Sequence, residues 1–596
     1  MSPPASHPPG GASPPEEGSS DLRFIGKLMP YLRADLPLYA TAMALAPVSA
    51  GLMILQPWLL KHAIDDAILP GDEAALADLA LAYLGAVFVA FLSEAGYTLA
   101  VAYAATRSIT RLRDDVFRHT LSLSQAFFDR EPTGRLLTRV TSDVEALGET
   151  LSAGAFTIVL DVMLVVGILV AMLALDPRLT ATLLLVAPPL ALAVELIRRM
   201  LRKLYQTVRT SLATLNAYTA ERIAGIEVVQ LYRDEARVLD QFDERLLRYR
   251  DAAIHTNVWD ALLYAIVDGL TSITMALMLW YGGASWLEGV ATAGLLAAFI
   301  EYIGKLFTPI RELSSKLAIL QRAASALEKI FGLLDHREHI TPGDRGLPAE
   351  PGKIELSGVS FAYGGGPDVL RGIDLTIAPG EVVALVGRTG SGKTTVGRVL
   401  RRAYDGYRGS IRIDGIELSR VRLDALRSRI SVVQQDVVLY PGDVRFNLAL
   451  GRDIDDARLL AAIELAQAGD VVARLGGLDG RIDHGGRNVS VGEAQLLSFA
   501  RTLAHESPLV ILDEATASVD TLTEARIQVA TEAVLERRTV LVVAHRLSTI
   551  THADRIVVLS AGQVLEQGRH TELLARGGAY AALFHSRFDE ATPEAS

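Results

Sequence analysis

Apolar runs long enough to cross a membrane recur through the first half of this sequence, and they constrain its fold more than any other feature. A helix of about 20 residues spans the hydrocarbon core of a bilayer. Such runs lie at roughly 36–60, 76–104, 153–175, 179–197, 258–281 and 294–310, and we predict a transmembrane helix at each. The composition agrees, because 50% of the residues are hydrophobic, 21% are charged and the mean hydropathy is +0.28.

The segments that connect these runs differ in length and charge. Short loops such as 65–78 and 282–293 carry acidic residues and few basic ones, whereas the long stretches after the second and fourth runs are rich in Arg. Basic loops stay on the cytoplasmic side, so the long stretches and both termini are predicted to be cytoplasmic. The N-terminus lacks the pattern of a cleaved signal peptide. We therefore expect a multi-pass protein of the cytoplasmic (inner) membrane.

Composition also divides the chain into parts. Residues 1–20 are rich in Pro, Gly, Ser and Glu and are predicted to be a disordered tail, and residues 589–596 form a second tail. Helical periodicity marks residues 21–335 as the membrane domain, and Pro and Gly mark 336–352 as a linker. From 353 to 588 short β-branched runs alternate with helices. The predicted fold class is a membrane all-α domain followed by an α/β domain built on a mostly parallel sheet.

Charge and cysteine content exclude several classes of function. The net charge of −11 argues against a nucleic-acid partner, whose phosphates favour a basic face. The sequence has no cysteine, which rules out disulfides, thiolate metal sites and cysteine nucleophiles.

A glycine-rich loop follows the strand predicted at Val382–Val386. The loop fits the P-loop pattern and consists of Gly387, Arg388, Thr389, Gly390, Ser391, Gly392, Lys393, Thr394 and Thr395. Glycines allow backbone N–H groups to surround phosphates at the N-terminus of the following helix. We expect Lys393 to bridge the β- and γ-phosphates of ATP and the Thr394 hydroxyl to bind Mg²⁺.

Two carboxylates end a second apolar strand, predicted at Leu509–Leu512. Asp513 and Glu514 then lie at the carboxyl edge of the sheet, where ligands bind in such folds. Asp513 is predicted to join the Mg²⁺ shell, and Glu514 to act as the general base that activates water. A solvated acidic pair that caps the next helix is the alternative.

Further motifs follow in an order that resembles ABC ATPase domains. The resemblance covers residues 353–588 and, together with the preceding membrane runs, extends to ABC exporters of the multidrug type. It implies that Tyr363 stacks on adenine and that Gln435 senses Mg²⁺ and touches the membrane domain. It also implies that His545 contacts the γ-phosphate and that Asp520 belongs to the D-loop, which faces the partner's nucleotide.

The signature loop of this family aligns with Val489–Glu493, where the usual sequence is Leu-Ser-Gly-Gly-Gln. The resemblance implies that this loop contacts ATP held by a second subunit through Ser490, Val491, Gly492 and Glu493. Ser490 and Gly492 match the family, whereas Val491 adds bulk and Glu493 adds negative charge. The single copy of each domain makes the chain a half-transporter. Because its own signature departs from the pattern, we predict a bacterial heterodimer, with a homodimer as the alternative.

Two long cytoplasmic stretches resemble the coupling segments of ABC exporters. They contain Phe127–Arg135 and Glu221–Arg233 and are expected to dock on the ATPase domains. Asp161, Asp268 and Glu301 fall within predicted membrane spans, where each should face a polar cavity or a partner. Two roles are equally open for these acids: contact with cationic substrates, and structural hydrogen bonds near helix ends.

The function implied by this resemblance is ATP-driven export of an amphipathic or lipid-like compound by alternating access. A peptide exporter and a lipid flippase share the architecture and remain open alternatives. A non-transport ATPase acting on nucleic acid is disfavoured by the membrane runs and the acidic charge. An ATP-gated channel or regulator is the alternative from another class.

Overall fold

The computed structural model describes residues 20–348, 352–513, 520–536, 538–544 and 547–588. They fall into two compact units. The helical unit lies within Met1–Leu121 and Gly134–His336, and the ATPase unit lies within Ser122–Thr133 and Arg337–Ser596.

The helical unit is built from long helices and shorter helical segments between them. The long helices are α2 (Leu36–His62), α3 (Glu73–Ser122), α7 (Ala155–Leu175), α8 (Pro177–Ala224), α10 (Glu235–Leu287) and α11 (Ala293–Leu334). The shorter segments are α1 (Ser20–Leu32), η1 (Arg33–Asp35), η2 (Ala63–Ile68), α5 (Thr133–Thr138), η3 (Arg139–Asp143), α6 (Val144–Glu149), η4 (Thr150–Gly154) and α9 (Ile226–Leu231).

Each apolar run predicted from the sequence lies within or overlaps one of the six long helices. Several of these helices far exceed what a bilayer requires: α3 has 50 residues, α8 has 48 and α10 has 53. At about 1.5 Å per residue they are more than twice as long as the hydrocarbon core is thick. Helices of this length extend beyond the hydrocarbon core. The helix also continues through Pro188 and Pro189 inside α8.

Four stretches of the described residues are long and apolar enough to cross a membrane. They are Gly26–Ile68, Glu73–Ser122, Thr133–Leu175 and Glu235–Leu287. The fourth and sixth predicted spans lie in α8 and α11, and neither helix is among these four stretches. Glu301 and Lys305 interrupt the apolar run of α11, and a charged pair lowers mean hydropathy without preventing burial. These two spans stay predictions.

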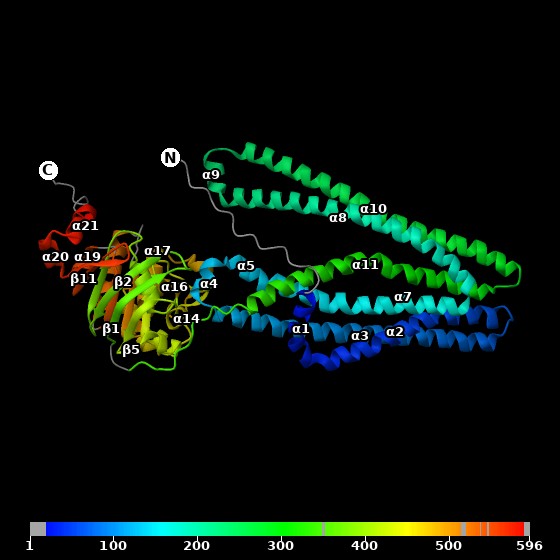
Figure 1. The fold of residues 1–596 in the computed structure, drawn as a ribbon, viewed down its shortest axis with the longest axis horizontal. Helices are drawn as coiled ribbons and strands as arrows, with labels where there is room; N and C mark the ends of the chain where they lie inside the picture. The colour runs from blue at the N-terminus through cyan, green and yellow to red at the C-terminus, as the bar shows by residue number, and fades with distance from the viewer. Residues whose placement is uncertain (1–19, 349–351, 514–519, 537, 545–546, 589–596) are drawn as a thin grey trace. The chain divides into compact units, whose positions relative to one another are not determined.

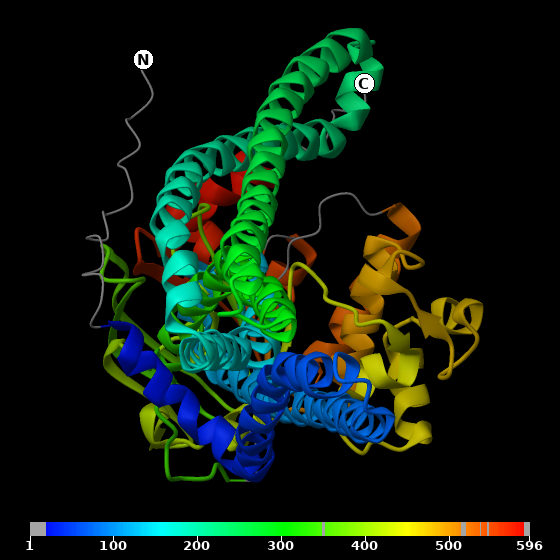
Figure 2. The same cartoon turned by 90° about the vertical axis from the view of Figure 1, so that its right-hand side faces the viewer.

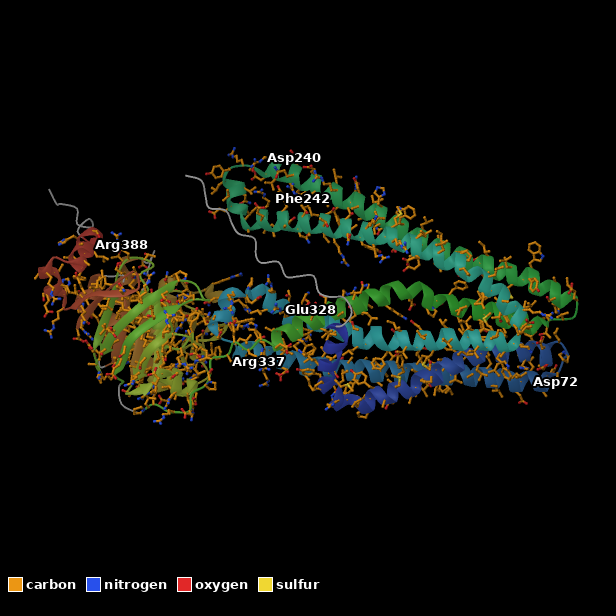
Figure 3. The ribbon with its side chains drawn as sticks, in the orientation of Figure 1. Asp72, Asp240, Phe242, Glu328, Arg337 and Arg388 are labelled. Carbon is orange, nitrogen blue, oxygen red and sulfur yellow. The ribbon has the colours of Figure 1, made fainter. Side chains whose placement is uncertain are left out.

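α8 and α10 lie side by side along their length and are joined through the short helix α9, as both views show (Figures 1 and 2). Asp240 and Phe242 mark the α10 end of this hairpin near α9, and Asp72 lies at the opposite end of the helical unit (Figure 3). The long connections and the short acidic loops thus occupy opposite ends, as the sequence predicts.

Close packing joins the middle of the helical unit. Ile168 and Met172 of α7, Leu179 of α8, and Phe299 and Ile303 of α11 are buried in one apolar cluster. A Cβ atom on Gly282 of α10 would lie 2.3 Å from the Cδ2 atom of Leu296, so a larger residue there would require the Leu296 side chain to move.

The described part of the ATPase unit contains two main sheets and a small two-stranded one, in which β7 (Gly442–Asp443) pairs with β8 (Arg481–Ile482). The antiparallel sheet has the order β2-β1-β4-β5, with β1 (Ile354–Ala362), β2 (Asp368–Ile377), β4 (Arg408–Ile413) and β5 (Ile416–Glu417). The larger sheet has the order β12-β11-β3-β10-β9-β6, with β3 (Val382–Val386), β6 (Ile430–Val433), β9 (Leu509–Asp513), β10 (Thr539–Val543), β11 (Arg555–Ser560) and β12 (Gln563–Gly568). Its strands are parallel except β12, which pairs antiparallel with β11.

Helices cover the larger sheet and add a helical region between β6 and β9. They are α12 (Lys393–Leu400), α13 (Leu423–Arg429), α14 (Val444–Ala449), α15 (Asp456–Leu465), α16 (Gly469–Leu475), α17 (Val491–Ala504), α18 (Thr521–Leu535), α19 (Leu547–Thr551), α20 (His570–Arg576) and α21 (Ala579–Phe588). The short elements η5 (Leu418–Arg420), β7 (Gly442–Asp443), β8 (Arg481–Ile482) and η6 (His484–Gly486) complete the unit. All five residues of β3 are buried, as expected for a central parallel strand.

Most of the first predicted coupling segment, up to Thr133, belongs to the ATPase unit, whereas Gly134 and Arg135 belong to the helical unit. Its short helix α4 (Gln125–Arg130) lies between α3 and α5 and ends before Pro132. Ser124 donates its N–H to the carbonyl of Glu338 over 2.8 Å, and Arg130 pairs with the carboxylate of Glu338. These contacts fix α4 to the strand-bearing unit.

Candidate functional site: the carboxyl edge of the parallel sheet

The parallel register of the larger sheet brings several predicted site residues to one edge. Strands β3, β6, β9, β10 and β11 run in the same direction, so their carboxyl ends share that edge. Gly387 follows β3, Gln435 follows β6 by two residues, and Asp513 is the last residue of β9. This is the edge at which ligands bind in open α/β sheets.

The predicted loop between β3 and α12 has the tight geometry that only glycine permits. A Cβ atom on Gly387 would lie 2.2 Å from the carbonyl oxygen of Leu559. Gly392 has φ +103°, and a Cβ there would lie 2.9 Å from the Leu370 side chain. Both glycines therefore hold the backbone close to its neighbours and leave its N–H groups at the N-terminus of α12.

Lys393 and Ser391 fit a bound phosphate group. Lys393 is buried, and its Nζ donates to the carbonyls of Gly387 over 2.8 Å and Arg388 over 3.1 Å. The Oγ atom of Ser391 is buried with no hydrogen-bond partner among the described residues. An unmet buried hydroxyl is costly unless a ligand completes it. Arg388, Thr389 and Gly390 are exposed at the tip of the loop.

Thr394 and Asp513 come together from different elements. The Thr394 Oγ1 at the start of α12 lies 3.4 Å from the Asp513 Oδ1 at the end of β9. A hydroxyl beside a carboxylate provides two of the oxygen ligands that Mg²⁺ takes in such sites. Over the described residues no group of three or more His, Cys, Asp or Glu side chains could hold a metal ion by itself. The remaining ligands must then come from other groups, as Mg²⁺ usually takes them from water and substrate phosphate.

Tyr363 lies at the end of the antiparallel sheet beside the phosphate loop. Its hydroxyl hydrogen-bonds to Thr395 Oγ1 over 3.0 Å. Its ring packs edge to face against Phe361 and Tyr404, with centroids 4.9 and 5.0 Å away. Phe361 and Tyr404 thus hold the predicted adenine-stacking ring in place.

Outside the signature loop, four predicted site residues remain, and the structure describes two of them, Gln435 and Asp520. Gln435 is exposed in the loop after β6. Asp520 caps α18 by accepting the N–H of Thr523 over 3.0 Å, and the contacts with Thr523 lower the pKa of Asp520. Glu514 and His545 lie outside the described residues, so their roles stay predictions.

The divergent signature loop forms the N-terminus of α17. Ser490 is the cap residue: its Oγ accepts the N–H of Glu493 over 3.3 Å, and the Glu493 carboxylate accepts the N–H of Ser490 over 2.8 Å. Val491 is 73% exposed, and Gly492 is buried. The loop is therefore a regular capping box. Sequence reasoning did not find Arg474, which pairs with Glu493 over 2.8 Å.

Tyr404 is a second residue that the sequence did not single out. Its hydroxyl donates a hydrogen bond to the Asp129 carboxylate of α4, while its ring contacts Tyr363. Burial and the hydrogen bond to Asp129 raise the pKa of Tyr404. The alternation of apolar and polar residues along the sequence could not reveal the hydrogen bond between Tyr404 and Asp129, because these residues are far apart in sequence.

Asp161 and Glu301, two acids predicted in the membrane spans, pair with lysines. Asp161 of α7 forms an ion pair with Lys316 of α11, which also pairs with Glu312 over 3.0 Å. Glu301 pairs with Lys305 on the same helix over 3.0 Å. Pairing of this kind offsets part of the free-energy cost of placing ionised side chains among apolar helices.

A phosphate-binding edge on a parallel sheet, in one chain with helices of membrane-spanning length, defines an ATP-driven membrane protein. The sequence matches the family of ABC transporter transmembrane regions over residues 39–310 and the ABC transporter ATPase family over residues 370–517. The chain belongs to the ABC transporter family. It is an ATP hydrolase that binds ATP with Mg²⁺ and carries one membrane region and one ATPase domain.

Similar proteins include lipid and drug transporters. The ATP-dependent lipid A-core flippase of Burkholderia orbicola is 33% identical over 96% of this chain and 97% of its own length. A multidrug efflux ATP-binding/permease protein of Mycobacterium bovis is 36% identical over 93% of this chain and 47% of its own length. A solved bacterial Atm1-family ABC exporter with ATP bound covers 94% of this chain at 27% identity, with a TM-score of 0.74.

Proposed function

We propose that this chain is one half of a dimeric exporter that uses ATP to move an amphipathic small molecule or a lipid out of the cytoplasmic leaflet. The observation that carries the proposal is the contact of Thr394 with Asp513 beside the buried Lys393. A Mg²⁺ ion, when bound there, neutralises charge on the phosphates. Lys393 orients the γ-phosphate, and Glu514 accepts a proton from the attacking water.

The pairing of membrane charges supports an amphipathic substrate. Lys305 balances the charge of Glu301, whereas Lys316 pairs with both Asp161 and Glu312. Apolar helices that carry such ionised side chains favour a substrate that joins an apolar body to a polar or charged group. The related lipid A-core flippase and multidrug efflux proteins are consistent with either substrate type.

A dimer accounts for two features of the chain. The mycobacterial efflux protein is about twice as long as this chain, since the chain matches 47% of it. Apolar side chains are exposed around α9, namely Ile223, Ile226, Val228, Leu231 and Tyr232. Exposed clusters of this kind mark interaction surfaces, and the ATPase domain of a second subunit is the proposed partner.

We further propose that the partner is a different subunit. Val491 stands on the exposed end of α17, where the usual signature has glycine, and its side chain adds bulk toward a facing nucleotide. A partner with the usual signature would complete the site formed by Lys393 and Asp513. ATP hydrolysis by this chain purified alone tests this point: weak turnover that rises on adding the copurifying subunit supports it, and full activity alone contradicts it.

Substrate type is tested in proteoliposomes with two probes. One is ethidium, a lipophilic cation, and the other is a phospholipid with a fluorescent headgroup whose leaflet is read by chemical quenching. ATP-dependent movement of either probe is expected, and the preferred probe identifies the substrate type. Glu514→Gln is the control: it should retain ATP binding and lower hydrolysis and movement by orders of magnitude. Movement that follows the electrochemical gradient without ATP turnover would instead indicate a gated channel.

A further inference from the structure

The signature loop carries an acidic side chain where it is expected to approach phosphate. Glu493 is the third residue of α17, three residues after Ser490 and directly after Gly492. A carboxylate free to turn toward a bound triphosphate would repel it, because like charges at short range are unfavourable in a partly buried site. An acidic signature therefore requires something that holds this carboxylate elsewhere.

The structure supplies two contacts that fix the Glu493 carboxylate. Its Oε2 atom accepts the N–H of Ser490 over 2.8 Å and the Nη2 of Arg474 over 2.8 Å. Arg474 comes from the last turn of α16, a different helix. Its Nη1 atom also donates to the carbonyl of Asn488 over 3.2 Å, just before the loop. The guanidinium thus joins the loop and the carboxylate.

The position of Asn488 makes this arrangement rigid. The Asn488 Nδ2 donates to the carbonyl of Arg481 over 2.9 Å, and its Oδ1 accepts the N–H of Asp483 over 3.0 Å. Arg474 therefore contacts a loop that these hydrogen bonds of Asn488 hold in place. The Arg474 side chain is 49% exposed and the Glu493 side chain 25%. The two hydrogen bonds that Arg474 makes, to Glu493 and to the Asn488 carbonyl, give this pair a defined geometry that an isolated surface ion pair lacks.

The ionisation state of Glu493 agrees with the geometry. Burial alone would raise the pKa of Glu493, but the N–H of Ser490 and the Arg474 guanidinium outweigh burial and lower the pKa. The side chain is therefore a carboxylate at neutral pH, and its charge is balanced by Arg474.

We propose that Arg474 is a positioning residue, which holds the Glu493 carboxylate against its own helix so that Ser490 and Gly492 can contact nucleotide despite the acidic signature. This inference rests on the proposed role of the loop in binding ATP across the dimer. It predicts that Arg474 is needed because Glu493 is acidic, and that the requirement disappears when the charge is removed.

Substitutions at both positions separate this role from simple fold stability. Glu493→Gln keeps the capping box, because glutamine also accepts the N–H of the cap residue, but it removes the charge. The Glu493 loop is proposed to cover ATP held by the partner subunit, so hydrolysis must be blocked at both sites. In the purified transporter carrying Glu514→Gln and the equivalent substitution in the partner subunit, we would measure radiolabelled ATP retained after dilution. Arg474→Ala should weaken retention by roughly five- to tenfold, in line with the loss of one charge-assisted contact. Arg474→Ala with Glu493→Gln together should return retention to within about twofold of the Glu493→Gln level.

A matched control removes another ion pair from the same helix. Arg526 pairs with Asp470 of α16 over 2.7 Å and does not contact Glu493. Arg526→Ala should leave retention unchanged. If the double variant retains as little ATP as Arg474→Ala does, the inference is wrong. The inference is also wrong if the loss of ATP retention in both variants follows their loss of melting temperature, because Arg474 then serves the fold alone. Loss of retention in Lys393→Ala checks the proposed function separately: if Lys393→Ala retains ATP normally, the proposed function itself fails.

Discussion

Lys305 of α11 donates a hydrogen bond of 3.0 Å from its Nζ atom to the carbonyl oxygen of Met53 on α2. Met53 lies four residues before Pro57, which has no N–H, so the helix itself offers that carbonyl no donor. Lys305 also donates to Gln56 over 2.9 Å and pairs with Glu301 over 3.0 Å. One side chain thus completes a broken helix turn and balances a carboxylate.

Lys305→Ala should destabilise the helical unit, because it leaves the Met53 carbonyl and the Glu301 carboxylate without this partner. The expected loss is roughly 1–3 kcal/mol, as for a buried hydrogen bond or charge left unmet. Thermal unfolding in detergent, followed by loss of monodisperse protein, measures the effect.

Restoring the N–H of residue 57 provides the control. Pro57→Ala in the Lys305→Ala background gives the Met53 carbonyl a helical donor, so part of the lost stability should return. If the double variant is no more stable than Lys305→Ala, the link between Lys305 and the proline is not the source of the stability.

Ser391→Ala is expected to change stability and ATP affinity in opposite directions. The buried hydroxyl has no partner without ligand, so its removal should leave the melting temperature of the nucleotide-free protein unchanged or slightly higher. ATP affinity should fall by roughly five- to tenfold, because a hydrogen bond to a charged phosphate is lost. Melting curves with and without Mg²⁺-ATP measure both. A lower melting temperature without ATP and unchanged ATP affinity would contradict the fit of this hydroxyl to phosphate.

Tyr404→Phe tests the contact between α4 and the strand-bearing part of the ATPase unit. The substitution keeps the ring beside Tyr363 and removes the hydroxyl that donates to Asp129. We expect the KM for ATP to change less than about twofold, while probe movement per ATP falls by roughly threefold or more, as one partly buried hydrogen bond is lost. Tyr407→Phe is the matched control, because the Tyr407 hydroxyl contacts Glu417 within the same sheet region. Equal effects of both substitutions would show that α4 is not specifically involved.

His505 makes the ATPase unit sensitive to acid. Burial lowers the pKa of His505 from its ordinary value of 6.5, and Arg452 lowers it further. The folded protein therefore binds fewer protons than the unfolded chain once the pH falls below 6.5, and stability is lost toward the lowered folded pKa. Melting temperature should decline as the pH falls from neutral through 6.5, and His505→Gln should reduce this decline. An identical pH profile in the variant would contradict the assignment.

Much of the fold was predictable because it depends on local patterns. The bounds of β3 agree with the predicted strand, and each predicted apolar run lies within or overlaps one of the six long helices. The loop expected at 282–293 is shorter than predicted, since α10 continues to Leu287. Small residues in that stretch permit helix as readily as loop, so composition alone could not place its end.

The site was only partly predictable, for a different reason. The phosphate loop is continuous in sequence, and its motif specifies Lys393 and Thr394 directly. Arg474 and Lys316 act through tertiary contacts, since each comes from another helix than the acid it pairs with. No spacing along the chain encodes such pairs, so they become visible only once the helices are packed.

The central claim is that ATP hydrolysis at the Lys393 site drives movement through the membrane helices. The most direct test measures ATP hydrolysis and ATP-dependent movement of the two probes in the same proteoliposomes for Lys393→Ala. Lys353→Ala is the control, because Lys353 pairs with Glu355 over 2.6 Å on the same domain and does not belong to the phosphate loop. We predict that Lys393→Ala abolishes both activities and Lys353→Ala retains both. Continued probe movement in Lys393→Ala would contradict the account.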